Sequence, residues 1–303
     1  MRIFVTGAIG FVGRWLDREL VAHGHEVVAA PGPDELDITD RSGLVRWLGD
    51  PATRPDAVIH LAGMAFAPDA LQDPAEVFRV NVGGTVALFE ALREIGIRPP
   101  VMVSGSSDAY GVPRPHDLPL REDAPLAPLA PYALSKAAQE GVAVEASTRY
   151  GFPVVVTRSF NHAGPGQRPV FVVPVMAQRV MAVKRGQAAS IPVGNIDVRR
   201  DLTDVRDVVA AYRLLVEAAA NGTLPDRCAV VNVASGMAVT VRSVIERLCA
   251  LAGVAPVIEV DEALVRPSDP PEIRGDATLI RNLVGWQSRI PLEQTLRDVL
   301  AEM

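Results

Sequence analysis

Short apolar runs alternate with longer amphipathic stretches through the first half of the chain. The runs cover residues 2–6, 26–30, 56–62, 100–104 and 152–159, and stretches with helical periodicity cover 11–23, 41–48, 74–96 and 132–150. Several runs are apolar on both faces, as in Val154-Val155-Val156, which is typical of strands inside a parallel sheet. The alternation predicts βαβ units and therefore an α/β fold with a doubly wound parallel sheet of the Rossmann type.

The pattern loosens after about residue 161. A loop at 164–169 is followed by helical periodicity at 170–186, 204–220, 240–253 and 292–303. Short strands are predicted at 191–194 and 198–203, and a buried apolar strand at 228–234. The buried run at 228–234 is predicted to return to the first sheet. We therefore expect a nucleotide-binding domain of residues 1–163 plus about 201–236, with an interwoven C-terminal substrate lobe of about 164–200 and 237–303.

Composition and charge exclude several functional classes. The 303 residues are 49% hydrophobic, which is enough to bury a large core. The 36 acidic and 30 basic residues give a net charge of −6 without long runs, so no nucleic-acid partner is expected. Cys228 and Cys249 stand apart from any His cluster, and no metal site is expected. With no leader segment and no membrane-length apolar run, a cytoplasmic protein is expected.

A glycine-rich turn follows the first predicted strand. In TGAIGFVG, Gly7 suits a tight turn, Gly10 lets the backbone approach a pyrophosphate, and Gly13 lets the following helix pack closely. The anion would then lie on free N–H groups at a helix N-terminus. The position of this turn between a strand and an amphipathic helix predicts a dinucleotide site.

The second predicted strand ends in EVVAAPGP, without the acidic residue that commonly binds the adenosine ribose of NAD. This favours NADP(H), with NAD(H) still possible, although no obvious arginine is placed for the 2′-phosphate. Arg14 and Arg41 are the candidates within reach. Asp37 is expected either at the adenine edge or in a capping role.

Tyr132 and Lys136 lie four residues apart, on one face of a predicted helix. A tyrosine normally titrates near 10, and a nearby cation would lower its pKa enough for proton transfer near neutrality. The pair follows a serine cluster, VSGSSDAYG, at the end of the fourth strand. Ligands bind at the carboxyl ends of such strands, so proton-transfer chemistry is expected there.

These motifs together resemble the extended short-chain dehydrogenase/reductase family. The resemblance rests on TGAIGFVG, HLAG at 60–63, Asn81, SGSSDAYG, YALSK and SFNHAGPG, in the family's order. It implies Tyr132 as catalytic acid/base, Lys136 as its partner and Ser106 as the hydroxyl at the substrate carbonyl. His60 is expected to be packed rather than catalytic. The implied cofactor-binding residues are Gly7, Gly10, Phe11, Val12, Gly13, Asp37, Ile38, Leu61, Ala62, Gly63, Asn81, Ser104, Tyr132 and Lys136.

The resemblance also implies a nucleotide-sugar substrate. Asn161, Arg200 and Arg266 match positions expected to contact a diphosphate, and arginine offers charged donors suited to phosphate oxygens. Arg199 is the weaker neighbour. Val172 and Val173 would form an apolar wall, with core packing an equal alternative. The remaining implied contacts are Ser106, Ser107 and Asp108.

The finer resemblance is to GDP-6-deoxy-D-mannose reductases, through NHAGPGQRPVFVVP and VGNIDVRRDLTDVRDVV. It implies NAD(P)H-dependent reduction of the 4-keto group of a GDP-6-deoxyhexose, of rhamnose or talose type, with a heptose also open. Guanine is implied by analogy alone. A homodimer formed through the helices at 74–96 and 132–150 is a family expectation.

Asp108 bears on the choice between a reductase and a dehydratase. Related dehydratases typically carry Glu there and related reductases often do, so Asp departs from both patterns, and it is shorter by one C–C bond, roughly 1.5 Å. A displacement of that size damages proton transfer to a fixed atom, so reduction is favoured over dehydration. A 4-epimerase or 4,6-dehydratase with tightly held cofactor stays open, as does a non-catalytic dinucleotide sensor.

Overall fold

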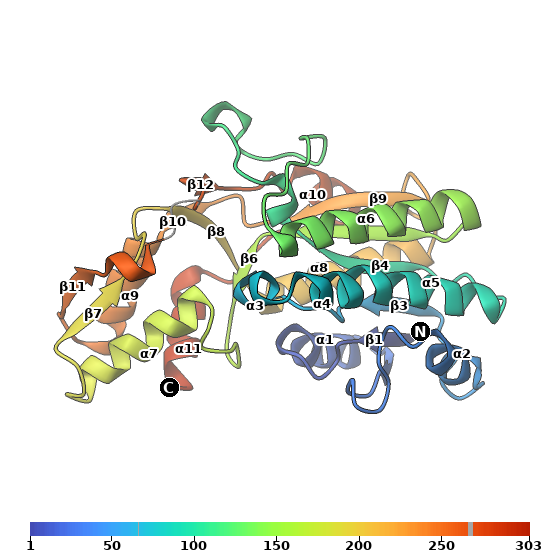
Figure 1. The fold of residues 1–303 in the computed structure, drawn as a ribbon, viewed down its shortest axis with the longest axis horizontal. Coiled ribbons are helices and arrows are strands. Elements are labelled where there is room, and N and C mark those ends of the chain that lie inside the picture. The colour runs from blue at the N-terminus through green and yellow to red at the C-terminus, as the bar shows by residue number, and fades with distance from the viewer. Residues whose placement is uncertain (66, 266–268) are drawn as a thin grey trace.

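The computed structural model describes residues 1–65, 67–265 and 269–303, apart from the side chains of residues 67 and 68. A six-stranded sheet forms its centre, in the order β2-β1-β3-β4-β5-β9 with every neighbouring pair parallel (Figure 1). The strands are β1 (Arg2–Thr6), β2 (Glu26–Ala29), β3 (Ala57–His60), β4 (Val101–Ser106), β5 (Val154–Ser159) and β9 (Cys228–Val233). The predicted doubly wound sheet is confirmed, and the run at 228–234 does return to it.

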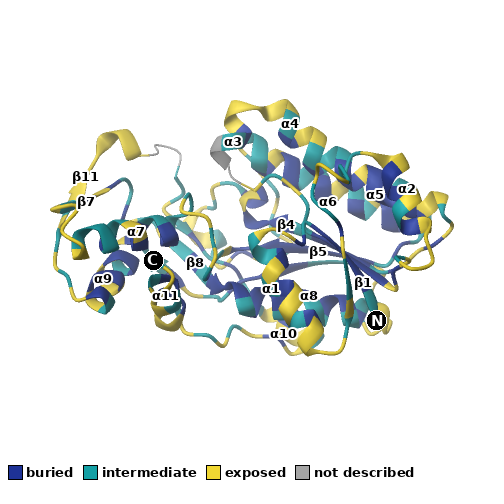
Figure 2. Ribbon diagram, turned by 90° about the horizontal axis from the view of Figure 1, so that it is seen from below, coloured by how far each residue is buried: buried dark blue, intermediate teal, exposed yellow. Residues whose placement is uncertain are grey.

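Helices cover both faces of this sheet because its strands are apolar on both sides. Ile3 and Val5 pack with α1 (Phe11–Ala22), α8 (Val205–Ala220) and α10 (Thr278–Val284) on one face. Phe4 points to the other face, toward α2 (Arg41–Gly49), α5 (Gly84–Glu94) and α6 (Pro131–Tyr150). The dark buried residues of Figure 2 lie along the strands and the inward sides of these helices.

The stretch predicted as one helix over 74–96 is divided in the structure. It consists of α4 (Pro74–Phe78), a π-helical turn at Arg79–Gly83 and α5, and it is preceded by the short helix α3 (Ala67–Gln72). A single π-helical turn inserts one extra residue, a feature frequent at functional sites. Here the turn carries Asn81, whose side chain is fully buried.

A smaller lobe lies beyond the carboxyl edge of the sheet. Its helices and strands are β6 (Asn161–Ala163), α7 (Val172–Lys184), β7 (Ser190–Val193), β8 (Arg199–Asp204), β10 (Ala238–Thr240), α9 (Val241–Ala252), β11 (Val257–Val260), β12 (Glu272–Ile273) and α11 (Leu292–Ala301). Short 3-10 turns lie at Ser107–Tyr110, Pro115–Asp117 and Glu262–Leu264. A separate apolar cluster from α7, α9, α11 and β7 fills the lobe. Ile280 and Trp286 instead pack into the core of the sheet. We therefore propose the predicted division of the chain into two domains, with the segment that contains these two residues assigned to the nucleotide-binding domain.

Two carboxylates, one on β8 and one on α8, bind the backbone of C-terminal segments. Asp201, fully buried, accepts hydrogen bonds from the backbone of Ser235 at 2.8 Å and of Gly275 at 3.2 Å. Asp207 accepts one from the backbone of Ile290 at 2.8 Å. Because buried donors need partners, these carboxylates fix the loops that run between sheet and lobe.

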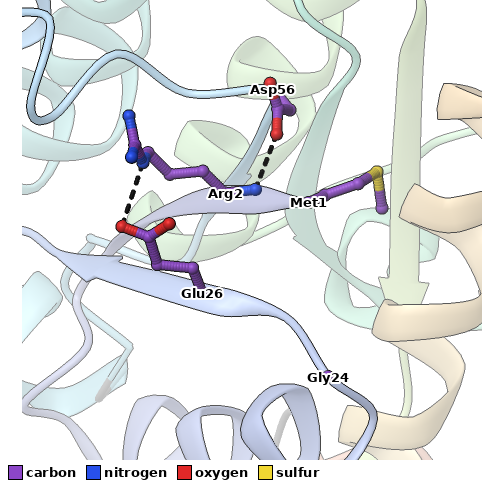
Figure 3. A pocket seen from close by; sticks show the side chains of 5 residues that line it. All are labelled: Met1, Arg2, Gly24, Glu26 and Asp56. Carbon is purple, nitrogen blue, oxygen red and sulfur yellow. Dashed lines mark hydrogen bonds and ion pairs between the residues drawn. The ribbon is translucent and has the colours of Figure 1, made fainter.

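A shallow hollow at the amino ends of the strands is bordered by Met1, Arg2, Gly24, Glu26 and Asp56 (Figure 3). Arg2 pairs with Glu26 at 3.0 Å, and its backbone N–H donates to Asp56 at 2.7 Å. These contacts join the beginnings of three strands. Ligands of doubly wound sheets bind at the opposite, carboxyl edge.

Among the helices within the described ranges, none has the length and apolar character needed to cross a bilayer.

Candidate active site

The glycine-rich turn lies where the strand order reverses, between β1 and β3. Gly7 adopts a φ of 72°, and its carbonyl accepts a hydrogen bond from Gly10 N at 3.0 Å. A Cβ on Gly13 would lie 2.3 Å from the Gly7 oxygen, so only glycine permits this contact between turn and helix. Helix α1 then begins at Phe11, and within the described residues no side chain caps its first N–H groups. The turn has the geometry of an anion cradle.

The segment after β3 closes one side of this cradle. A Cβ on Gly7 would come within 2.8 Å of Ala62 N. A Cβ on Gly63 would lie 2.8 Å from Asn81 Oδ1 and 3.6 Å from Lys136 Nζ. The turn, the HLAG segment and Lys136 therefore meet at one place, and this fits a dinucleotide laid across the carboxyl edge of the sheet.

Asn81 connects the HLAG loop with the helix that carries the tyrosine. Its side-chain N–H₂ donates to Ser135 Oγ at 2.9 Å, and its Oδ1 accepts from Met64 N at 2.8 Å. Ser135 Oγ in turn donates to the Tyr132 carbonyl at 2.7 Å. These contacts give Asn81 a positioning role, and its predicted contact with the cofactor stays a prediction.

Lys136 is buried at the start of α6, with 5% of its surface exposed. Its ammonium donates to the Ser104 carbonyl and to Gln139 Oε1, each at 2.8 Å. Burial lowers the pKa of Lys136 to about 8. The amine is therefore poised between its two protonation states near physiological pH.

Tyr132, Ser106 and Asp108 come together above the end of β4. Burial raises the pKa of the Tyr132 phenol, the negative charge of Asp108 raises it further, and a hydrogen bond with the Ser106 side chain lowers it. Ser106 Oγ also accepts from Asp108 N at 3.2 Å, which caps the 3-10 turn. The sequence-based expectation that Lys136 lowers the tyrosine pKa is wrong for this structure, because burial dominates and the direction is upward.

Part of the surface of Asp108 is exposed. Burial of its carboxyl by the surrounding protein raises the pKa of Asp108, and the charge of Arg200 lowers it. Arg200 comes from β8, so the two lobes meet at this carboxylate. The Arg200 guanidinium pairs with Asp269 at 3.4 Å and donates to the Pro270 carbonyl at 2.8 Å. The protein therefore holds Arg200 in place at the mouth of the site.

The other predicted substrate residues are placed as follows. Asn161 is exposed on β6, beside β8, in register with Leu202. Val172 is partly buried and Val173 is 1% exposed in the lobe core, which supports the core-packing alternative for Val173. Ser107 is buried, and the predicted Arg266 lies outside the described residues.

The remaining predicted cofactor residues lie around the turn. Phe11 stacks on His162 with 6.3 Å between ring centroids, Ile38 lies against Gly84, and Val12 and Leu61 pack at the edge of the core. Asp37 accepts from Thr39 N at 2.9 Å, which, as the largest cause, lowers its pKa. Arg41 is paired with Glu94, on α5.

Sequence reasoning missed polar residues buried beneath the site. Gln139 contacts Lys136, Thr85 contacts Gln139 at 2.8 Å, and the Tyr212 hydroxyl lies 2.7 Å from Ser159 Oγ. Gln139 and Thr85 are both fully buried, and Tyr212 is 1% exposed. The one sign of these residues in the sequence is a polar side chain at a position that faces inward on a predicted helix. His60 is fully buried, as predicted, with its pKa lowered to about 3 first by burial and then by the charge of Lys136.

Comparison with known proteins places the chain in a family. A family model described as GDP-mannose 4,6 dehydratase matches residues 34–299. A GDP-6-deoxy-D-mannose reductase from Pseudomonas aeruginosa is 37% identical over 99% of this chain and 96% of its own length.

Solved structures agree with this assignment. The structure of RMD from Pseudomonas aeruginosa complexed with NADPH has a TM-score of 0.88 at 36% identity, covering 99% of this chain and 98% of that one. A UDP-glucose 4-epimerase from Thermus thermophilus in complex with NAD has a TM-score of 0.84 at 28% identity, covering 100% of this chain and 98% of that one. The chain thus belongs to the GDP-mannose 4,6-dehydratase family of extended short-chain dehydrogenases/reductases.

Proposed function

We propose that this protein is an NAD(P)H-dependent oxidoreductase that reduces the 4-keto group of a GDP-6-deoxyhexose, with GDP-4-keto-6-deoxy-D-mannose as the expected substrate. The observation that carries the proposal is the convergence of Tyr132, Ser106 and Lys136 beside the glycine-rich cradle. The similarity to a GDP-6-deoxy-D-mannose reductase over nearly the whole chain supports the substrate class.

The residues divide the chemistry between them. The bound cofactor would supply the hydride to carbon 4. Ser106, already bonded to the Tyr132 side chain, would donate a hydrogen bond to the carbonyl oxygen as negative charge develops there. Tyr132 would give its proton to that oxygen, and its raised pKa keeps the phenol protonated for this task. Lys136 would hold the nicotinamide ribose.

Several features support NADP(H) over NAD(H). The end of β2 is followed by Ala30 and Pro31, with no acid to repel a 2′-phosphate. The similar RMD structure is complexed with NADPH. The Arg14 Nε donates to the Ile9 carbonyl at 3.0 Å, which holds this exposed guanidinium over the turn. Arg41 is engaged by Glu94, so Arg14 is the better candidate of the two.

The diphosphate end of the substrate is proposed to lie between the lobes. Arg200, anchored by Asp269 and Pro270, offers a charged donor beside Asp108, and Asn161 lies on the adjacent strand β6. The nucleotide would then reach from the catalytic tyrosine toward the smaller lobe.

The proposal is tested by mixing the protein with GDP-4-keto-6-deoxymannose and NADPH and following absorbance of the reduced cofactor. We expect stoichiometric loss of NADPH with formation of a GDP-6-deoxyhexose. GDP-mannose, which has no keto group, should cause no oxidation of NADPH and serves as the matched control. Conversion of the keto sugar without loss of NADPH would contradict the proposal.

A second candidate function is 4,6-dehydration or 4-epimerisation with recycled cofactor. It is favoured by Asp108, whose carboxyl is close enough to influence the Tyr132 pKa. The length of the Asp108 side chain argues against it, because Asp is one C–C bond shorter than Glu and its carboxylate would lie too far from the atom whose proton it must transfer. Release of a 4-keto product from GDP-mannose in the absence of added NADPH would identify a dehydratase.

We also propose a homodimer formed through α4, α5 and α6. Large apolar side chains are exposed along these helices, namely Phe78 at 39%, Val86 at 43% and Leu134 at 44%. Because a contiguous exposed apolar patch marks an interaction surface, the proposal is that these three side chains belong to one such patch.

A further inference from the structure

The Lys136 ammonium has three hydrogens, and residues within the described part of the chain accept two of them. One is donated to the Ser104 carbonyl on β4, and the other to Gln139 Oε1 on the next turn of α6, each at 2.8 Å. Gln139 is fully buried and has no surface from which to bind a ligand. Its side chain therefore acts on Lys136 and on its other neighbours within the protein.

The orientation of the Gln139 amide follows from the hydroxyl of Thr85. Thr85 donates its single proton to the Asn81 carbonyl at 2.7 Å. Thr85 Oγ1 can therefore only accept from the side chain 2.8 Å away, which makes that side-chain atom the Gln139 N–H₂. The Gln139 carbonyl must then face Lys136, as an acceptor.

The same logic extends from Thr85 to His60. Because Thr85 Oγ1 only accepts, His60 Nε2, 3.0 Å away, carries a proton. His60 Nδ1 then accepts from the Thr6 hydroxyl at 2.7 Å, and Thr6 Oγ1 accepts from Ala62 N at 3.1 Å. Each donor in this buried chain has one acceptor, and the chain ends at the backbone that lies against Gly7.

We propose that Gln139 is the positioning residue for Lys136: it holds the ammonium in place and favours its charged form. Among the residues that the structure describes, none accepts the third N–H of Lys136, which is therefore left for the ligand. Among the described residues, the titratable group that feels the Lys136 charge is His60 from β3. Tyr132 lies one turn earlier on α6, and Tyr212 from α8 lies 3.5 Å from Oγ of Ser104, the residue whose carbonyl accepts from Lys136. His60 is neutral, since its pKa is lowered to about 3, so Gln139 and the Ser104 carbonyl are the polar groups that offset burial of the charge.

The composition of the chain makes a direct test possible. Lys136 and the exposed Lys184 are its only lysines. In protein carrying ¹³C-labelled lysine, the Cε resonances of the two side chains can be followed by NMR across a pH titration. The Lys184→Arg variant leaves one resonance and assigns it. The wild-type Lys136 is expected to titrate at about 8.

Gln139→Leu has a similar side-chain volume but provides no acceptor for the ammonium. Loss of a hydrogen bond to a charged group disfavours the charged form, so the pKa of Lys136 should fall by about one pH unit. Gln139→Glu places a carboxylate at the same position and should raise the pKa of Lys136. Thr85→Val leaves the Gln139 side chain in place but removes the acceptor that orients it, together with the contacts of Thr85 to His60 and to the Asn81 carbonyl. It should lower the pKa of Lys136 by less than Gln139→Leu does.

Ser147→Ala is the matched control, because Ser147 is buried on the same helix but hydrogen-bonds to the Cys228 thiol. It should leave the Lys136 titration unchanged. An unchanged Lys136 pKa in a folded Gln139→Leu protein would overturn the inference. If that variant does not fold, opposite shifts in Gln139→Glu and Thr85→Val support the inference, and the lack of a shift in either overturns it.

The inference uses the proposed function only for the role given to Lys136. The titration needs neither cofactor nor substrate, so its outcome is independent of whether the proposed reaction is observed. Where the reaction is observed, Gln139→Leu should lower kcat about tenfold or more while KM for the sugar stays within about twofold.

Discussion

At the scale of single residues, the catalytic proposal depends on a hydroxyl and a carboxylate that both influence one phenol. The Ser106 hydrogen bond lowers the pKa of Tyr132, whereas burial and the charge of Asp108 raise it. Burial has the largest effect, so the phenol stays protonated over the range in which it must donate a proton. Substitution of Ser106 and substitution of Asp108 are therefore expected to have different effects.

Ser106→Ala should reduce kcat by about 10²–10³-fold, the usual loss when a donor to a developing oxyanion is removed. The KM for the sugar nucleotide should change little, because the donor acts mainly in the transition state. Steady-state kinetics with a 4-keto sugar nucleotide measure both quantities. A variant that kept nearly full kcat would contradict the role given to Ser106.

Asp108→Asn should retain much of the activity near neutral pH but change its pH dependence. Removing the negative charge lowers the pKa of Tyr132. Reduction needs the protonated phenol, so activity is lost as pH rises through this pKa, and the alkaline limb of the kcat profile should move to lower pH. A severe loss of activity at neutral pH would instead indicate a direct proton-transfer role for Asp108, as in a dehydratase.

The motif residues of the site could be predicted from sequence, because the motifs lie at the ends of predicted strands in the order of the family. Ser106, Tyr132 and Lys136 are brought together as expected. The supporting residues could not be predicted, because nothing local marks Gln139 or Thr85 as partners 54 residues apart. The direction of the Tyr132 pKa was also missed, since the extent of burial is a property of the folded site.

At the scale of elements, the glycine-rich turn and α1 depend on close backbone contact. A side chain at Gly13 would meet two carbonyl oxygens, of Gly7 at 2.3 Å and of Ala8 at 2.5 Å. Neither is the end of a flexible side chain, so the helix itself would have to move away from the strand. The cradle and the stability of the fold are therefore linked at this residue.

Gly13→Ala should lower the free energy of unfolding by about 1–3 kcal/mol, the range for overpacking, and weaken NADPH binding. Gly49→Ala is the matched control, since its Cβ would lie 3.7 Å from the Ile95 side chain in ordinary contact. That substitution in a helix should leave stability unchanged or raise it by up to about 1 kcal/mol. Urea denaturation and calorimetric titration with NADPH measure the two effects, and equal stability of both variants would contradict the argument.

Helix and strand positions were mostly predicted from periodicity, and the exceptions have physical causes. The stretch 74–96 is amphipathic throughout, so its pattern gave no sign of the π-helical turn that carries Asn81. The short strands β10, β11 and β12 exist through pairing with β7 and β8, which local sequence does not reveal.

At the scale of the whole molecule, the exposed apolar side chains on α4, α5 and α6 predict self-association. Leu134→Asp should shift a dimer toward monomer, because burying an unpaired charge in an interface is unfavourable. Val260→Asp is the control, as Val260 is 63% exposed on β11 of the other lobe. Light scattering after size-exclusion chromatography reports the mass, and a wild-type monomer would contradict the proposed dimer.

The most direct test of the proposed reaction follows the hydride itself. The protein would be incubated with GDP-4-keto-6-deoxymannose and NADPH carrying deuterium at both positions of carbon 4 of the nicotinamide, and the product examined by NMR. We expect one deuterium at carbon 4 of the product sugar for each NADPH consumed. A converted sugar without deuterium at carbon 4, with NADPH unchanged, would contradict it.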